Sequence, residues 1–456
     1  MNTPLIQTGP WVEHVKSCLD LEVIRARATL AAQPLPIWSG LSPTVYVDML
    51  KSAMQAVFIP TEQQLHCMRT LIEIVVAKYL RDYSSERDFQ AGVVDRHLSA
   101  NGDKYVDPGA TLITGLSGGG KSALLDGIGR VLIPGAIKLP LLGEEWPIHP
   151  LLLVRLTANS AQKALFADAF KQLNKRKLVK SDSLSQLSDE LAQVMYVHGV
   201  GALTLDELQF LSLSTGSTSK AVQLLVHCLG MGSPLIYCAN YSLVHKLLKQ
   251  PSEQKQRLIS SVIELYPEPF DSPDFVKILA ELQKVAPTLF EFDPANDAQE
   301  IFQLTAGPGR MLRHLLVASY KLVCNEKKPK VTLAVMKQAF RSADFTSDRV
   351  DVQAIMRIGV EGGSNHPDLR SPFPKSSRAD AFFAATKKAR AQQDALAAVL
   401  STLPAEQQRA IIKEQRKAAP AKVLPLKRSK EAADDRMEAA TRRFIESSGK
   451  GIHPCL

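Results

Sequence analysis

The sequence predicts an α/β fold in which a parallel β-sheet is flanked by helices, followed by a small all-helical domain. Three observations predict it. Short apolar runs alternate with helical patterns up to residue 266, the first run leads into a glycine-rich loop, and only helical patterns follow Pro267. Strands that alternate with helices favour a parallel sheet, because a crossover helix returns the chain to the start of the next strand.

The individual elements follow from periodicity and from capping residues. The expected strands cover residues 110–114, 151–156, 202–205 and 235–239. Thr61 is the expected N-cap of a long helix before the first strand, and crossover helices are expected from Lys121, around Phe166, and over 221–229 and 243–249. The helical domain is expected to hold helices at 272–286, 297–304, 310–323 and 333–340.

The C-terminal region has a different composition. Beyond residue 349 the chain is rich in Ala, Lys, Arg and Gln. Helices are possible at 379–400 and 404–418, but neither has a wide apolar face, so we expect a flexible tail whose helices form on a partner. Residues 361–456 hold 18 Lys and Arg against 11 Asp and Glu, which is +7 of the net charge of +9. A basic excess favours polyanionic partners such as nucleic acid.

Length and composition narrow the class of protein. The 456 residues are enough for two or three domains. No run approaches about 18 consecutive apolar residues, so no membrane span is expected. The N-terminus lacks the basic and apolar regions of a secretory signal. The six cysteines form no CxxC pair, which favours reduced thiols and a cytoplasmic protein.

The glycine-rich loop at residues 115–122, GLSGGGKS, fits the pattern GxxxxGK[ST] at every fixed position. Its glycines allow backbone N–H groups to close around phosphate oxygens at the positive end of the next helix. Lys121 is expected to reach the β- and γ-phosphates, and Ser122 to ligate Mg²⁺. The expected nucleotide-binding residues are Gly115, Gly118, Gly119, Gly120, Lys121, Ser122 and Ala123. The loop therefore predicts the binding of ATP with Mg²⁺.

A second motif follows 85 residues after Lys121, where the apolar strand at 202–205 ends in Asp206-Glu207. Asp206 is expected to contact the nucleotide through Mg²⁺, and Glu207 to orient and activate the attacking water. Two acids at a strand end are weak evidence alone, but they gain weight after a phosphate-binding loop. The adjacent Glu favours a hydrolase over a small-molecule kinase.

Three further polar residues are candidates for the same chemistry. Asn240 follows the strand at 235–239, where it could contact the γ-phosphate or the lytic water, although a simple turn after a strand is the alternative. Arg257 lies just before the strand-like run at 261–265, where it is either a finger for an adjacent subunit or a solvated cation at a helix end. Arg310 opens a helix of the helical domain and could report the nucleotide state to it, with Arg313 as a competitor.

These motifs appear in an order that resembles the AAA+ ATPases. More narrowly, residues 201–211 (GALTLDELQFL), the lead-in FIPTEQQL and the stretch GPGRMLRHLL are similar to the TnsC/TniB ATPases of DNA transposition. The resemblance covers residues 57–345. It implies a P-loop AAA+ sheet with a helical lid, so the expected parts are an N-terminal arm or subdomain at 1–56, the nucleotide-binding domain at 57–266, the lid at 267–348 and a basic tail at 349–456.

The resemblance also implies roles and partners. Lys121 and Ser122 take the Walker A role, Asp206 and Glu207 the Walker B role, and Asn240, Arg257 and Arg310 those of sensor 1, finger and sensor 2. It implies a homo-oligomeric ring or filament that assembles with ATP on duplex DNA and recruits and activates a transposase, with target-selector proteins as further partners. Candidate DNA contacts, through phosphates only, are Lys163, Lys171, Lys175 and Arg176, in a basic run that is equally well explained as a solvated helix face.

Two alternatives remain open at this stage. One is an ATPase of the replication-initiator or helicase-loader type, although such proteins usually carry a recognisable DNA-reading domain, and none is convincing here. The other is an assembly switch that binds ATP and hydrolyses it negligibly. The intact Glu207 favours turnover over such a switch.

Overall fold

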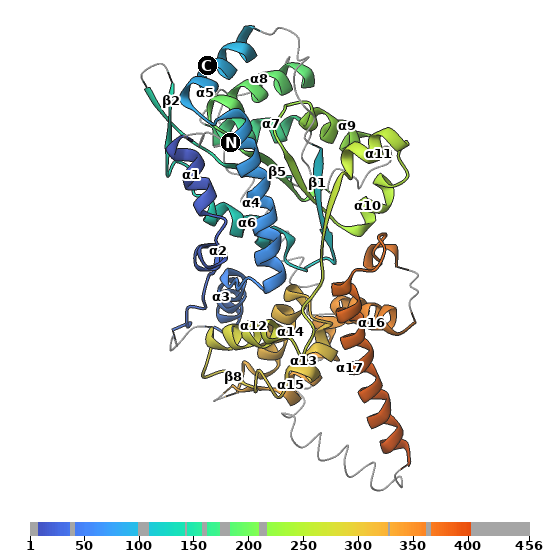
Figure 1. The fold of residues 1–456 in the computed structure, drawn as a ribbon. Helices are drawn as coiled ribbons and strands as arrows, with labels where there is room; N and C mark the ends of the chain where they lie inside the picture. Colours follow the sequence, from blue (N-terminus) through green and yellow to red (C-terminus); the bar gives the residue numbers. More distant parts are fainter. Residues whose placement is uncertain are drawn as a thin grey trace, which may run out of the picture.

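The computed structural model describes residues 8–36, 42–98, 109–141, 144–156, 162–173, 183–208, 217–326, 329–361 and 366–402. An α/β body lies above a smaller helical lid in Figure 1, and the long helix α4 runs along the body toward the lid. Of the helices that the structure describes, none is long and apolar enough to cross a membrane.

A five-stranded parallel sheet forms the centre of the body. Its strands, in spatial order, are β4 (Leu151–Arg155), β5 (Ala202–Asp206), β6 (Leu235–Ala239), β1 (Ala110–Gly115) and β7 (Ser261–Leu265). The register pairs Thr111 with Ile236 on one side and with Ser261 on the other. The four expected strands and the strand-like run at 261–265 are therefore the five neighbouring strands of this sheet.

Alternation along the strands divides the side chains between the two faces of the sheet. Leu112 packs into a core on one face, and the next residue, Ile113, packs into a core on the other. The first face is covered by α7 (Gln162–Gln172), α8 (Leu184–Val197) and α9 (Ser217–Leu229). The second face is covered by α4 (Glu62–Asp82) and α6 (Lys121–Val131), with α5 (Glu86–Leu98) packed nearby. Both faces are buried, as a parallel sheet requires.

Smaller elements complete the body. The hairpin β2 (Lys138–Leu141) and β3 (Glu144–Pro147), which is not among the strands expected from the sequence, lies between α6 and β4 along the chain. Helices α10 (Tyr241–Leu247) and α11 (Ser252–Leu258) connect β6 to β7. Five cysteines lie within the described residues, and all five are free thiols.

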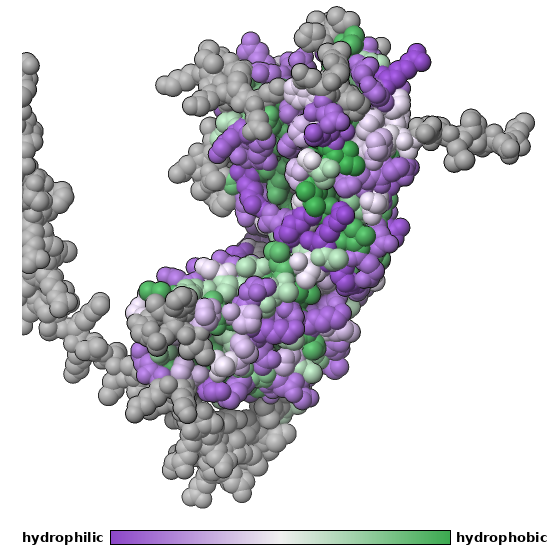
Figure 2. Space-filling view, turned by 90° about the vertical axis from the view of Figure 1, so that its left-hand side faces the viewer, coloured by the Kyte–Doolittle hydropathy of each residue, from purple (hydrophilic) through white to green (hydrophobic). Residues whose placement is uncertain are grey.

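The N-terminal segment is shared between the body and the lid. Helices α1 (Pro10–Ser17) and α2 (Leu21–Ala28) pack against α4 and α6 of the body. Helix α3 (Pro43–Ala56) instead contributes Leu50 and Met54 to the core of the lid. Figure 2, which views the side that carries these helices, shows a surface dominated by hydrophilic residues that narrows between body and lid.

The lid is built from helices, as the sequence predicts. It contains α12 (Pro273–Lys284), α13 (Ala298–Thr305), α14 (Gly309–Val323), α15 (Leu333–Phe340), the 3-10 turn η2 (Ala343–Phe345) and α16 (Thr346–Glu361). The short strands β8 (Phe290–Glu291) and β9 (Val331–Thr332) pair beside α15. The predicted fold class, a parallel α/β sheet flanked by helices with a small helical lid, is confirmed by this arrangement.

The C-terminal region differs from the flexible tail expected from residue 349. Helix α16 crosses that position, and after η3 (Pro367–Leu369) the helix α17 (Ser377–Thr402) packs on the lid. The buried face of α17 is narrow, and its apolar residues are Ala379, Phe382, Ala385 and Ala389. Three alanines allow close approach of the helices without forming a wide apolar stripe, which is why the sequence pattern concealed this packing. The rest of the expected tail, 403–456, lies outside the described residues.

Helix α4 begins with a capping box at the junction of body and lid. Thr61 Oγ1 accepts a hydrogen bond from Gln64 N at 3.3 Å, and Gln64 Oε1 accepts one from Thr61 N at 3.1 Å. Asp274 of the lid accepts a further bond from Glu62 N at 2.7 Å. The start of α4 is therefore held by both its own cap and the lid.

We expect Thr61→Ala to lower the free energy of unfolding by about 1 kcal/mol, because the Gln64 N–H loses its acceptor. Chemical denaturation followed by circular dichroism would measure the loss. Thr61→Ser is the matched control, since it keeps the hydroxyl. Equal stability of the two variants would show that the cap does not contribute.

Candidate nucleotide-binding site

The phosphate-binding loop connects the end of β1 to the start of α6, as predicted. Gly118 has φ +76° and Gly120 has φ +93°, so both occupy the left-handed region that favours glycine. A Cβ on Gly118 would lie 2.7 Å from Arg310 Cβ. A Cβ on Gly120 would lie 2.9 Å from Gln64 Nε2, so side chains at both positions would crowd the neighbours of the loop.

Lys121 is the first residue of α6 and is 9% exposed. Its ammonium donates hydrogen bonds to Gly115 O at 2.9 Å and to Leu116 O at 3.0 Å. Burial lowers the pKa of Lys121 to about 8. A buried cation at the positive end of a helix is suited to an anionic ligand. Burial disfavours the charged ammonium, and the negative charge of a phosphate would stabilise it. Ser122 and Ala123 follow it in the first turn of α6.

The strand order brings the other predicted residues to the same edge of the sheet. β6 lies between β5 and β1, and all three strands run in the same direction. Asp206 at the end of β5 and Asn240 directly after β6 therefore lie at the edge where β1 enters the loop. Parallel sheets commonly bind ligands beyond the carboxyl ends of their strands.

Asp206 is 3% exposed, and its two carboxylate oxygens have different surroundings. Its Oδ1 accepts a hydrogen bond from Glu207 N at 2.9 Å. Among the described residues, its Oδ2 has no hydrogen-bond partner, although Arg155 Nε lies 3.8 Å away. A buried carboxylate oxygen without a donor is costly unless a cation or an ordered water completes it. Asp206 thus fits a Mg²⁺ site.

The side-chain donors at this site would suit Mg²⁺ that is held together with a nucleotide. Within the described part of the chain no group of three or more His, Cys, Asp or Glu side chains is placed to hold a metal alone. Mg²⁺ typically uses one or two protein ligands plus substrate phosphates and water. Ser122 and Asp206 are the residues that would supply them.

Glu207 occupies an unusual backbone conformation. Its φ is +62°, a region that residues with a side chain rarely adopt. Burial and the neighbouring Asp206 carboxylate raise the pKa of Glu207 above its usual value. Strain of this kind persists where surrounding structure demands it, and it is concentrated at functional sites. A raised pKa also makes a carboxylate a better proton acceptor.

Asn240 stands at the N-cap position of α10 without capping it. Its backbone is extended, with φ −79° and ψ 160°, but its side chain accepts no hydrogen bond from the first turn of the helix. Asn at this position normally supplies that bond. The half-buried amide therefore remains available for another role at the sheet edge.

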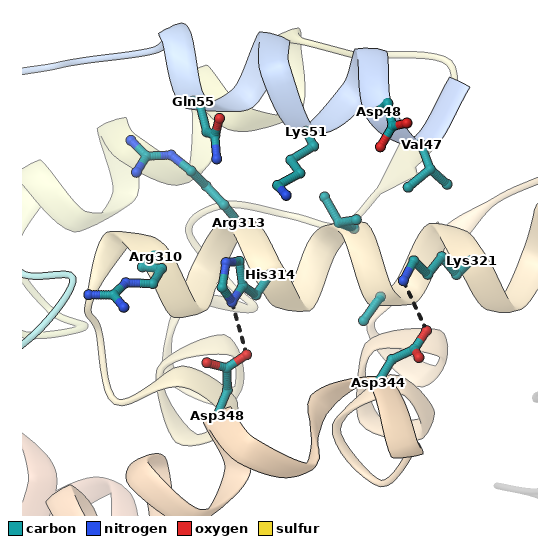
Figure 3. A pocket seen from close by; sticks show the side chains of 12 residues that line it. Val47, Asp48, Lys51, Gln55, Arg310, Arg313, His314, Lys321, Asp344 and Asp348 are labelled. Carbon is teal, nitrogen blue, oxygen red and sulfur yellow. Dashed lines mark hydrogen bonds and ion pairs between the residues drawn. The ribbon is translucent and has the colours of Figure 1, made fainter. Parts of the chain in front are cut away.

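Arg310 reaches the phosphate-binding loop from the lid. Its Nη2 donates a hydrogen bond to Ser117 Oγ at 2.5 Å, and its backbone N donates to Gly118 O at 3.4 Å. The competitor Arg313 turns away and donates to Met54 O and Val57 O, each at 3.0 Å. Figure 3 shows the two side chains leaving α14 in different directions. Of these two arginines, only Arg310 contacts the phosphate-binding loop.

A cavity of about 260 Å³ extends from Arg310 along α14. It is lined by α3, α14, η2 and the start of α16, and its walls combine charged side chains with apolar ones such as Val47 (Figure 3). His314 Nδ1 lies 2.9 Å from Asp348 Oδ2, and Lys321 Nζ lies 3.3 Å from Asp344 Oδ2. These pairs tie α14, which carries Arg310, to η2 and α16.

Arg257 is not brought together with the other candidate residues of its own chain. It lies at the end of α11, exposed, where the chain enters β7. Nearby, Ser260 Oγ accepts from Ala110 N at 2.7 Å, so this is the edge of the sheet where β1 begins. The length of β1, six residues at about 3.3 Å each, separates this edge from the phosphate-binding loop.

The candidate DNA contacts are only partly described. Lys163 is half-buried in the first turn of α7, and Lys171 is exposed in its last turn. Lys175 and Arg176, with the rest of the basic run, lie outside the described residues. A role in DNA binding therefore stays a prediction for all four.

Three residues near the site were missed by the sequence analysis. Ser117 is the partner of Arg310, the amide of Gln64 lies against Gly120, and Arg155 stands beside Asp206. Arg155 could have been found, because it ends the apolar strand β4 as Asp206 ends β5, and the register pairs them directly. Ser117 and Gln64 lie within the quoted stretches GLSGGGKS and FIPTEQQL, but those patterns give neither residue a role.

We expect Arg310→Ala to weaken ATP binding without lowering the unfolding temperature, because its guanidinium contacts the loop and not the core. Arg313→Ala should instead cost about 2 kcal/mol of stability, since two carbonyls lose a charged donor. Isothermal calorimetry with ATP and thermal unfolding would separate the effects. Exchanged results for the two variants would contradict the assignment.

Comparison with known proteins finds distant structural similarity only. No protein-family model matches the chain, and no curated protein matches it. The Orc1 protein of Aeropyrum pernix in complex with DNA has a TM-score of 0.38 at 15% identity, covering 75% of this chain and 86% of that chain.

Cdc6p from Pyrobaculum aerophilum has a TM-score of 0.36 at 14% identity, covering 78% of this chain and 92% of that chain. The RuvB Holliday junction branch migration motor of Thermotoga maritima has a TM-score of 0.30 at 12% identity, covering 61% of this chain and 76% of that chain. At these values the function has to be inferred from the residues of this chain.

Proposed function

We propose that this protein is an ATPase of the AAA+ type that assembles on duplex DNA and regulates DNA transposition. One observation carries the ATPase part: Lys121, Asp206 and Glu207 meet Asn240 at one edge of the sheet, and Arg310 joins them from the lid. The transposition part rests on the resemblance of residues 57–345 to the TnsC/TniB ATPases.

Each residue of the proposed site has a role that its position supports. Lys121 and the loop N–H groups hold the phosphates, while Ser122 and Asp206 hold Mg²⁺. Glu207 orients the attacking water and accepts its proton, and Asn240 contacts the water or the γ-phosphate. Arg310 links the bound nucleotide to the lid. When bound, Mg²⁺ neutralises charge on the phosphates.

The position of Arg257 supports a homo-oligomer. An arginine at the opposite edge of the sheet serves a nucleotide only if that nucleotide belongs to a neighbouring subunit. Such a contact is heterologous, because each subunit gives an arginine on one side and receives one on the other. Heterologous contacts build rings or helical filaments.

Duplex DNA is the partner that the charge supports. The chain carries a net charge of +9, and the basic side chains of Lys163 and Lys171 lie on one helix of the body. Contacts to phosphates would give affinity without sequence preference. Transposase and target-selector proteins are further proposed partners, in line with the resemblance.

We expect Glu207→Gln to bind ATP and assemble but to hydrolyse ATP at least about 100-fold more slowly, because the amide cannot accept the proton from water. A phosphate-release assay with and without duplex DNA would measure turnover. Normal turnover by this variant would contradict the role of Glu207. Negligible turnover by the unmodified protein, with normal ATP binding, would favour the assembly switch.

Imaging by electron microscopy, with duplex DNA and a non-hydrolysable ATP analogue, tests the assembly. We expect a ring or helix threaded by the duplex, and Arg257→Ala should disrupt turnover while leaving ATP binding intact. A monomer that ignores DNA would contradict the proposal. Loading of a replicative helicase in place of stimulation of a transposase would favour the replication-initiator alternative.

A further inference from the structure

Helix α17 lies across the junction between the α/β body and the lid. The chain passes from β7 to α12 through residues 266–272, here called the hinge segment. Three residues of this segment contact α17. The Tyr266 ring lies 6.0 Å from the Phe382 ring and 6.2 Å from the Phe383 ring, measured between centroids.

The other end of the hinge segment is held by the same helix two turns later. Lys388 Nζ lies 3.6 Å from Asp271 Oδ2 and 5.2 Å from the centre of the Phe270 ring. The ion pair is exposed and contributes little by itself. Together with the aromatic contacts, it makes α17 run alongside the whole hinge segment.

The helix is also fixed to the lid. The Phe382 ring lies 6.1 Å from the Phe302 ring, and Gln303 Nε2 donates a hydrogen bond to Ala389 O at 2.8 Å. Phe382 is 1% exposed, so it is a full member of the lid core. Helix α17 is therefore packed into the lid and also contacts the hinge segment.

The chain from η3 to α17 also contacts the body close to the proposed nucleotide site. His245 Nε2 of α10 lies 3.2 Å from Arg370 O, just after η3. Phe382 and Phe383 line a small space together with Leu116 of the phosphate-binding loop and Tyr241, which follows Asn240. The packing of α17 thus extends from the hinge segment to the back of the loop.

We infer that α17 is a splint that sets the angle of the lid, with Phe383 as a positioning residue for Arg310. The inference rests on the proposed nucleotide site. Arg310 contacts Ser117 only while the lid is held in this orientation, because Arg310 belongs to the lid and Ser117 to the body. Weaker contacts between α17 and the hinge segment lower the fraction of molecules in which Arg310 contacts Ser117.

The kinetic consequence follows from a population argument. The apparent dissociation constant rises in inverse proportion to the fraction of protein in the binding-competent state. Saturating ATP selects that state again, so the maximum rate is nearly restored. A weakened splint should therefore raise KM and change kcat little.

The test compares two half-buried phenylalanines of the lid region. Phe383→Ala removes one of the two rings that contact Tyr266, and Phe340→Ala removes a ring that packs on Phe345, away from the hinge segment. We expect Phe383→Ala to raise KM for ATP, and Kd for the fluorescent analogue mant-ATP, by about three- to tenfold with nearly unchanged kcat. Phe383→Tyr should restore both values.

Hydrogen–deuterium exchange of the full chain supplies the second readout. Phe383→Ala should speed exchange in residues 266–272 and in the phosphate-binding loop, whereas Phe340→Ala should not. Equal KM, Kd and exchange for the two alanine variants would overturn the inference, as would faster hinge exchange with unchanged Kd. If the unmodified protein did not bind mant-ATP, the proposed function would fail, and hinge exchange alone would still decide whether α17 acts as a splint.

Discussion

Parallel pairing of β5, β6 and β1 is the constraint on which the rest of the molecule depends. Because the three strands run in one direction, their carboxyl ends meet at one edge, and Asp206, Asn240 and the phosphate-binding loop are placed together. Parallel strands need crossover helices, and these cover both faces of the sheet. The polar groups are therefore confined to the open edge, where a ligand can reach them.

In the lid, two arginines of helix α14 contact different parts of the molecule. Arg310 and Arg313 lie one turn apart on α14, yet the first donates to Ser117 of the loop and the second to the carbonyls of Met54 and Val57. Burial lowers the pKa of Arg313, and its hydrogen bonds hold α3 against the lid. Arg313 thus stabilises the packing of helix α14, and Arg310 is carried on the same helix.

Much of this arrangement could be predicted from the sequence, since apolar periodicity and a strict loop pattern identify the strands, Lys121 and Asp206. The sequence could not show which of Arg310 and Arg313 contacts the phosphate-binding loop. Residues three positions apart lie on the same side of a helix, and either could reach it. The packing of α17 was missed because alanines bury a helix without marking it as strongly apolar. The division of the first 56 residues between body and lid depends on tertiary contacts alone.

The length of α17 has a mechanical consequence. The helix continues from Ala389, its hydrogen-bonded contact with Gln303, to Thr402, and Figure 1 shows this end projecting from the lid. Thirteen residues at about 1.5 Å each form a rod of roughly 20 Å. A force applied at the far end acts on Tyr266 and Asp271 with the leverage of that rod. Small displacements of the far end of α17 would therefore change the torque on the hinge segment between the body and the lid.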